Sequence, residues 1–194
     1  MVAIDGWAPG AVQVPRDGES ELVHTERSDR RPPPGGIIAR PIRPTDKHAL
    51  GELFETLSER SRLHRFLHPK AMLSARELGY FTEVDHRTHE ALVAFAPDGR
   101  LVAVARYAAV ADDQTTADIA CTVHDAWQNR GIAGWLAGPL IEHARGNGIV
   151  RLRAMTLADN HAARKLLRRL GFTVNETHRG VIYLELATLP ASFR

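Results

Sequence analysis

The chain has 194 residues, of which 44% are hydrophobic and 25% charged, proportions that are typical of a globular protein and exclude wholesale disorder. Its 25 basic and 23 acidic side chains leave a net charge of +2, which is too small to indicate a nucleic-acid-binding protein. No apolar run approaches the roughly 20 residues that span a bilayer, the N-terminus lacks a secretory pattern, and the single cysteine, Cys121, excludes an internal disulfide. We therefore expect a cytoplasmic protein with neither membrane nor nucleic acid as partner.

Residues 1–36 differ in composition from the rest of the chain. They contain four basic and six acidic residues, a net charge of −2, which leaves +4 on the remainder. The segment has no sustained periodicity and ends in three prolines and two glycines, a sequence that favours an extended chain and breaks regular structure. We expect residues 1–36 to form a flexible or loosely docked tail and residues 37–194 to form one domain.

The first half of this domain predicts strands on either side of a helical region. Ser74, followed by Glu77 three residues later, is a capping-box signature, and residues 97–100 (Pro-Asp-Gly-Arg) form a turn sequence. The expected elements are a strand over 37–43, a helix that Thr45 caps, a helix near 61–67, a helix that begins at Ser74, and strands over 91–96 and 101–110.

The second half alternates strands and helices and then ends in a hairpin. Glycines follow both expected helices, at Gly146 and Gly171, where they favour a helix end. The expected elements are a strand over 116–123, a helix over 132–145, a strand over 150–156, a helix over 160–170, and paired strands over 172–177 and 181–187.

The turn between residues 123 and 134 is the motif that indicates chemistry. A strand leads through a short turn into a helix whose first residues follow the pattern Gln-x-x-Gly-x-Ala. The amides and positive dipole end of a helix N-terminus can hold an anion, Gly131 and Ala133 leave room for a phosphate, and Arg130 adds a positive charge. The turn predicts a cofactor with a pyrophosphate. A tight turn without a ligand is the alternative, since the motif fits neither a Walker A nor a dinucleotide fingerprint.

A second segment narrows the interpretation. Some 30 residues further on, the chain has Asn160, Ala163 and Leu166 at the spacing Asn-x-x-Ala-x-x-Leu, followed by Gly171 and Phe172. With the first motif, this segment resembles the GNAT superfamily of acetyl-CoA-dependent N-acetyltransferases, and the element order from residue 37 to 187 agrees with that resemblance.

The GNAT resemblance implies an α/β (α+β) fold with a mixed, mostly antiparallel sheet of six or seven strands, splayed in the middle and flanked by helices. It also implies acetyl-CoA as co-substrate and no metal, with pantetheine in the splay and pyrophosphate on the turn. The cofactor-binding residues that it implies are Cys121, Thr122, Val123, Gln128, Asn129, Arg130, Gly131, Ile132, Ala133, Gly134, Asn160, Ala163 and Leu167.

A narrower resemblance concerns residues 40–46 and 57–66, which are similar to the opening of the bacterial protein lysine acetyltransferases called Pat. This resemblance implies a protein lysine as the amine acceptor. A small-molecule amine is one alternative, and an acyl-CoA-binding regulatory module without catalysis is another. The sequence leaves open whether the protein is a monomer or a homodimer.

The reaction needs a group that removes a proton from the acceptor amine, whose pKa is about 10.4. Asp118 is the catalytic candidate because it lies in the strand that would flank the thioester, with Glu90 and Glu185 as alternative bases. Amide groups near Thr122 and Val123 would stabilise the carbonyl oxygen. The resemblance implies a tyrosine acid at position 167, where this chain has Leu167, so Tyr107, Tyr183 or water would substitute.

Clusters of basic residues and histidines allow more than one interpretation. A basic stretch over residues 60–70 could line the acceptor site, where it would favour acidic acceptors, or form a solvated helix face. His86 and His89 are three residues apart in an expected loop, without further ligands at metal-binding spacing, so we expect solvated histidines and no zinc site. The basic stretch consists of Arg60, Arg62, His64, Arg65, His68 and Lys70.

Overall fold

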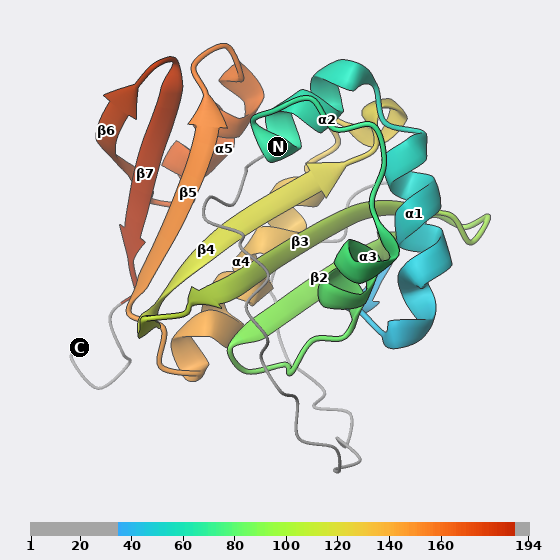
Figure 1. Cartoon of the computed structure of the whole chain (residues 1–194), viewed down its shortest axis with the longest axis horizontal. Coiled ribbons are helices and arrows are strands. Elements are labelled where there is room, and N and C mark those ends of the chain that lie inside the picture. The colour runs from blue at the N-terminus through green and yellow to red at the C-terminus, as the bar shows by residue number, and fades with distance from the viewer. Residues whose placement is uncertain (1–34, 189–194) are drawn as a thin grey trace.

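A computed structural model describes residues 35–188 of the chain. The expected tail therefore lies almost entirely outside the described residues, as do residues 189–194, and both stay predictions. The described residues form one seven-stranded sheet with strand order β1-β2-β3-β4-β5-β7-β6, with helices on both faces (Figure 1).

The elements follow one another in the expected order. Two short 3-10 helices, η1 (Pro44–Asp46) and η2 (Asp125–Trp127), accompany five α-helices within residues 35–188. The strands are β1 (Ile38–Pro41), β2 (His89–Phe95), β3 (Leu101–Val110), β4 (Asp113–Val123), β5 (Arg151–Leu157), β6 (Thr173–His178) and β7 (Val181–Ala187). The α-helices are α1 (Lys47–Glu55), α2 (Glu59–Phe66), α3 (Ala75–Thr82), α4 (Ile132–Gly146) and α5 (His161–Arg169).

The sheet is antiparallel except where β4 meets β5. These two strands are parallel, and their pairing covers only three residue pairs, of which Asp118 opposite Arg153 is the last. Beyond this pair the two backbones diverge, so residues 119–123 of β4 and 154–157 of β5 are not paired with each other (Figure 1); this splay between the two strands is called the gap below. The mixed, mostly antiparallel and splayed sheet expected from the sequence is thereby confirmed.

Two hydrophobic cores, one on each face of the sheet, hold the helices in place. On one face, α4 and α5 pack on side chains that include Ile119, Cys121 and Leu152. On the other, α1, α2 and α3 pack on side chains that include Val93 and Val104. Because side chains alternate along a strand, Asp118 and Thr122 face α1–α3, whereas Ile119 and Cys121 face α4.

Two local expectations need correction. Thr45 does not cap a helix; it lies inside η1, and the Asp46 carboxylate there accepts from the Arg43 amide and from the Arg40 guanidinium. The second helix begins at Glu59, because the Ser58 hydroxyl caps it. The capping box of Ser74 is confirmed. Among residues 35–188, no helix combines the length and apolar composition that a membrane crossing requires.

Candidate active site

The turn before α4 is built to expose backbone amides. Asn129 and Gly131 both have left-handed backbone conformations, with φ of 60° and 82°. The first helical hydrogen bond runs from the Trp135 amide to the Gly131 carbonyl at 3.0 Å, so the Ile132 and Ala133 amides precede it and have no acceptor within the helix. A Cβ at Gly131 would meet no atom within 4 Å. The turn therefore offers amides and open space, as phosphate binding requires.

Side chains around this turn brace it from outside. The side-chain amide of Gln128 donates to the Val123 carbonyl at 3.1 Å and to the Ser61 hydroxyl at 3.2 Å, which fixes the turn to the end of β4. Arg130 donates to the Ala126 carbonyl and stacks over the Trp127 ring at 4.6 Å. Gln128 thus positions the turn, while the Arg130 guanidinium stays at the surface beside it.

The register between β3 and β4 determines which backbone amides of β4 point toward the gap between β4 and β5. The His124 amide donates to the Val102 carbonyl on β3 at 2.8 Å. Because hydrogen-bonding directions alternate along an antiparallel strand, Thr122 turns its amide toward β3, whereas Cys121 and Val123 turn theirs toward the gap. Of the two expected oxyanion donors, only Val123 therefore has an amide on the side of the gap.

Several expected cofactor contacts are buried side chains. Cys121, Ile132, Ala163 and Leu167 all lie in the core under α4 and α5, and burial raises the pKa of the Cys121 thiol to about 11. Such a thiol is protonated at neutral pH and packs as a small apolar group.

The two remaining residues of this set are Asn160, which precedes α5, and Gly134, in the first turn of α4. The Asn160 side-chain oxygen accepts from the Ala163 amide at 3.1 Å, as an N-cap of α5. A Cβ at Gly134 would approach a methyl group of Leu166 on α5 to 3.3 Å, so the Leu166 side chain would have to shift by a few tenths of an ångström.

Asp118 lies where the gap between β4 and β5 begins. Its carboxylate accepts two hydrogen bonds from Arg153, from Nε at 2.8 Å and from Nη2 at 3.0 Å. The Asp118 side chain is 12% exposed and that of Arg153 41% exposed. No sequence pattern links Arg153 to Asp118, because only the pairing of two distant strands brings the two residues opposite each other.

The alternative bases occupy different places. Side chains alternate along β2, so the Glu90 side chain lies on the face of the sheet opposite to His89 and Asp118. It contacts His86 at 3.0 Å and lies 3.7 Å from His143 of α4. The hydrogen bond with Glu90 raises the pKa of His86. Glu185, on β7, is opposite Arg153 of β5, so it lies on the same face as Asp118, with β5 between the two residues.

The tyrosines proposed as acids are likewise separated. The Tyr107 hydroxyl donates to the Arg87 carbonyl at 2.7 Å and lies 3.0 Å from His143; burial raises its pKa. Tyr183 is opposite Met155 on β5. Tyr107 therefore belongs to the cluster beneath the end of α4, away from the gap.

A further polar group shares the face of Asp118. His89, Ala108 and Asp118 form one row across β2, β3 and β4. The Arg106 Nη1 lies 3.2 Å from His89 Nε2, and burial together with the Arg106 charge lowers the pKa of His89 to about 3. His89 is therefore neutral and accepts from Arg106. Tyr80 stacks on the His89 ring at 4.8 Å. The expectation of a solvated loop histidine is therefore wrong for His89, which is buried at the start of β2.

The basic stretch over residues 60–70 begins on α2 and extends beyond its end, and it contains both paired and buried side chains. His64 and Arg60 lie near the Asp159 carboxylate at 3.3 and 3.8 Å, and Lys70 pairs with Glu77 at 2.7 Å. Arg65 is buried against the sheet. A uniformly solvated helix face is therefore excluded.

The N-terminus of α2 is hydrogen-bonded to the turn that precedes α4. The Asp125 carboxylate accepts from the Ser58 amide at 2.9 Å and from the hydroxyls of Ser58 and Ser61 at 2.8 and 2.6 Å. Burial alone would raise the pKa of Asp125, but these hydrogen bonds outweigh it and the pKa lies below its usual value. The contact joins α2, which carries Arg65, to the turn. Metal-binding clusters of three or more His, Cys, Asp or Glu are absent from the described residues.

The splayed sheet and the turn before α4 are the features that the GNAT resemblance implies, and the comparisons agree with that resemblance. The model of the acetyltransferase (GNAT) family matches residues 52–172, so the chain belongs to this family. The GNAT domain of S. lividans PAT has a similar structure, with a TM-score of 0.72 and 31% identity over 77% of this chain and 89% of that one.

Two curated relatives extend the comparison. Acetyltransferase Pat of Mycolicibacterium smegmatis is 37% identical over 58% of this chain, which spans only 34% of that protein. Acetyltransferase PA5475 of Pseudomonas aeruginosa is 32% identical over 70% of this chain and 74% of its own length. A Salmonella typhimurium acetyltransferase, yncA, solved with acetyl-CoA, has a TM-score of 0.65 and 20% identity over 79% of this chain and 94% of that one, a likeness of fold alone.

The Asp125 contact predicts a pH-dependent contribution to stability. Asp125→Asn should lower the melting temperature at pH 7, because three hydrogen bonds lose their charged acceptor; a loss of about 1 kcal/mol corresponds to roughly 2–4 °C. A carboxylate with a lowered pKa stabilises the fold above its unfolded pKa of about 3.9 and loses this effect as the pH falls through the folded value. Calorimetry from pH 7 to pH 3 should show that the difference in melting temperature between the wild type and Asp125→Asn disappears below about pH 4. Asp112→Asn, at an exposed position, is the control. A difference in melting temperature that does not depend on pH would contradict the stabilising role of the ionised Asp125.

Gly131 allows a test of the phosphate site with matched shapes. Asn and Asp both tolerate a positive φ, and both would project into the open space above the turn. Gly131→Asp should lose acetyl-CoA affinity by at least tenfold more than Gly131→Asn, because only Asp places a negative charge near phosphate. Titration calorimetry on both folded variants measures this difference. Equal affinities in the two variants would remove the pyrophosphate from this turn.

Proposed function

We propose that the chain is an N-acetyltransferase that transfers acetyl from acetyl-CoA to a primary amine, by direct attack of the amine in a ternary complex. The observation that carries this proposal is the junction of an open amide turn, an unpaired gap and a carboxylate at the start of that gap. The residues of this junction fit the cofactor: the turn offers amides and space for the pyrophosphate, and the gap offers unpaired backbone to its amide-bearing arm.

Acetyl-CoA supplies the acetyl group as a thioester, activated for attack by an amine. The Val123 amide faces the gap and can donate to the carbonyl oxygen as negative charge develops there. A thiol pKa of about 8.5 makes the leaving thiolate stable without a strong acid, which is consistent with Leu167 at the position where many relatives would have a tyrosine.

Asp118 is the proposed base, and Arg153 is its proposed positioning residue. An ammonium group must lose a proton before its nitrogen can attack, and Asp118 can take that proton directly or through a water. Both Asp118 oxygens accept from Arg153, which fixes the plane of the carboxylate and leaves further lone pairs for the acceptor. The short aspartate side chain favours a bridging water.

A protein lysine is the proposed acceptor. The support is similarity to Acetyltransferase Pat and to the S. lividans PAT domain, both above 30% identity. A small-molecule amine is the second candidate, favoured by the buried arginines described below. A cytoplasmic location and a monomeric or homodimeric state remain predictions from the sequence.

Asp118→Asn tests the base. The variant keeps an acceptor for Arg153 but cannot take a proton at neutral pH, and general-base assistance is typically worth about 100- to 10,000-fold. We expect kcat/KM to fall at least tenfold at pH 7 with acetyl-CoA affinity preserved, and the loss to shrink at high pH, where the amine is partly neutral. A steady-state pH profile with the best acceptor from a panel of lysine peptides and small amines measures this.

Glu185→Gln is the matched control, since it removes a carboxylate on the same face and should change the profile little. Near-full activity of Asp118→Asn at pH 7 would exclude Asp118 as base. An equal loss at every pH would mean that the carboxylate holds the acceptor and does not deprotonate it. Acetyl-CoA binding without transfer to any amine of the panel would favour the non-catalytic module.

A further inference from the structure

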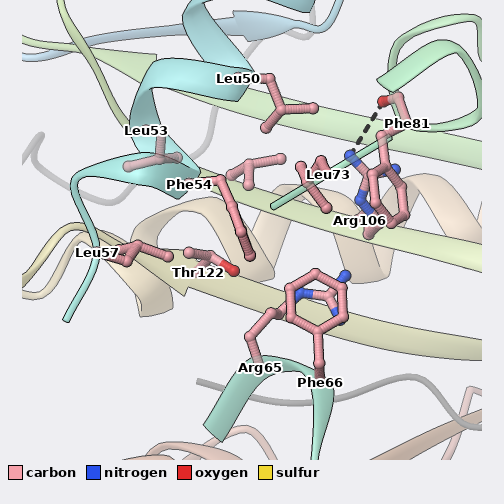
Figure 2. Close-up of a pocket in the computed structure, with 11 residues that line it drawn as sticks. Leu50, Leu53, Phe54, Leu57, Arg65, Phe66, Leu73, Phe81, Arg106 and Thr122 are labelled. Carbon is pink, nitrogen blue, oxygen red and sulfur yellow. Dashed lines mark hydrogen bonds between the residues drawn. The ribbon is translucent and has the colours of Figure 1, made fainter. Parts of the chain in front are cut away.

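A small cavity of about 30 Å³ lies between the sheet and helices α1 and α2, on the face of Asp118 (Figure 2). Its walls are largely apolar, formed by side chains that include Leu53, Phe54 and Phe66. Two guanidinium groups, those of Arg65 and Arg106, also line it. Two cations in an apolar cavity are unusual, because buried charges are normally paired.

Neither guanidinium has a carboxylate partner within residues 35–188. Arg106 is 2% exposed; it donates to the Phe81 carbonyl at 3.0 Å and lies 4.4 Å from the Phe81 ring centre. Arg65 is 7% exposed and lies over the rings of Phe66 and Phe81 at 4.9 and 6.0 Å, and among the described residues it makes no hydrogen bond. Arg65 therefore has its donors available to a ligand.

The two charges also act on each other. Burial lowers the pKa of Arg65 to about 10 and that of Arg106 to about 9, and the neighbouring Arg65 charge contributes to the shift of Arg106. Both groups remain charged at neutral pH. An anion between them would offset both the burial and the repulsion, and guanidinium groups match the planar geometry of a carboxylate.

The cavity is next to the proposed chemistry. Arg106 is opposite Ala120 of β4, and Asp118 is two residues from Ala120, so it lies on the same face about 7 Å along the strand. Thr122, which lines the cavity, lies on the same strand. A space that holds one or two water-sized groups admits a carboxylate but not a whole acceptor, whose amine would then extend along β4 toward Asp118.

We propose that Arg65 and Arg106 form an anion site that binds a carboxylate of the amine acceptor and so selects amino-carboxylate substrates. The inference rests on the proposed acetyl transfer and specifies its acceptor. The carboxylate can belong to a free amino acid or to an acidic side chain beside a lysine in a peptide. The chemistry of recognition is the same, and the experiment separates the two sources.

The test compares acceptors that differ only in a carboxylate. One pair is L-lysine and cadaverine; the other is two blocked peptides in which lysine is followed by aspartate or by asparagine. In the wild-type enzyme, the carboxylate member of one pair should have a kcat/KM at least tenfold higher. A higher kcat/KM for L-lysine than for cadaverine identifies a free amino acid as the source of the carboxylate. A higher kcat/KM for the aspartate peptide than for the asparagine peptide identifies a peptide as the source.

Arg65→Met keeps the length of the side chain without its charge. It should bring the ratio within the responding pair close to one, while kcat/KM for the member without a carboxylate changes by less than about threefold. Arg100→Met, an exposed arginine in the β2–β3 turn, is the control and should keep the wild-type ratio. A ratio near one in both wild-type pairs, or an unchanged ratio in Arg65→Met, would overturn the proposal.

A second measurement does not depend on activity. Propionate titrated at constant ionic strength against chloride should raise the melting temperature of the wild type and of Arg100→Met, but not of Arg65→Met. If none of the acceptors is acetylated, the proposed function fails, and the propionate titration alone decides whether the anion site exists. If Arg65→Met does not fold, Arg106→Lys takes its place in both measurements, with a reduced acceptor ratio as the expected result.

Discussion

The early end of one parallel ladder is the constraint on which the rest of the site depends. β4 and β5 pair over three residue pairs and then diverge. Within residues 35–188, backbone groups that a continuous sheet would satisfy point toward the gap, and buried backbone groups without partners are costly. A ligand with amides of its own can replace the missing strand contacts. The ion pair of Asp118 and Arg153 stands at the last paired position, so it links the two strands where their backbones separate.

The Asp125 contact extends this arrangement to the acceptor side. Asp125 belongs to the turn that would hold the cofactor, and its partners Ser58 and Ser61 belong to the beginning of α2. Gln128 adds a bond from the same turn to Ser61 and to the end of β4. Because Arg65 lies further along α2, a displacement of the turn would move one wall of the cavity. The turn before α4 and the cavity therefore both contact α2.

Local sequence signals predicted much of this molecule, whereas contacts between distant segments were beyond them. The capping box at Ser74 and the glycine-rich turn at Gly131 depend on neighbouring residues, and both have the expected form. Alternation along β4 places Asp118 and Cys121 on opposite faces of the sheet. Arg153 could not be assigned to Asp118, because the register of two parallel strands is set by tertiary packing. Thr45 was misjudged because Asp46 forms an ion pair with Arg40, a contact from another element.

The sheet also separates two polar clusters that look alike in the sequence. Glu90, His86, Tyr107 and His143 gather beneath the end of α4, where Glu90 already contacts a histidine. Asp118, Arg106 and His89 lie on the opposite face, where burial keeps His89 neutral.

The charge balance of the Asp118 face follows from this separation. Asp118 is paired with Arg153, whereas Arg65 and Arg106 lack carboxylates within residues 35–188, so the described cluster has an excess of positive charge. An acceptor with one ammonium and one carboxylate matches both parts of this face: its carboxylate would offset the buried cations, and its ammonium would meet the carboxylate at the start of the gap. Complementary charges at two points fix an orientation that one point cannot, and the amine would be directed to the edge of the gap before it loses its proton.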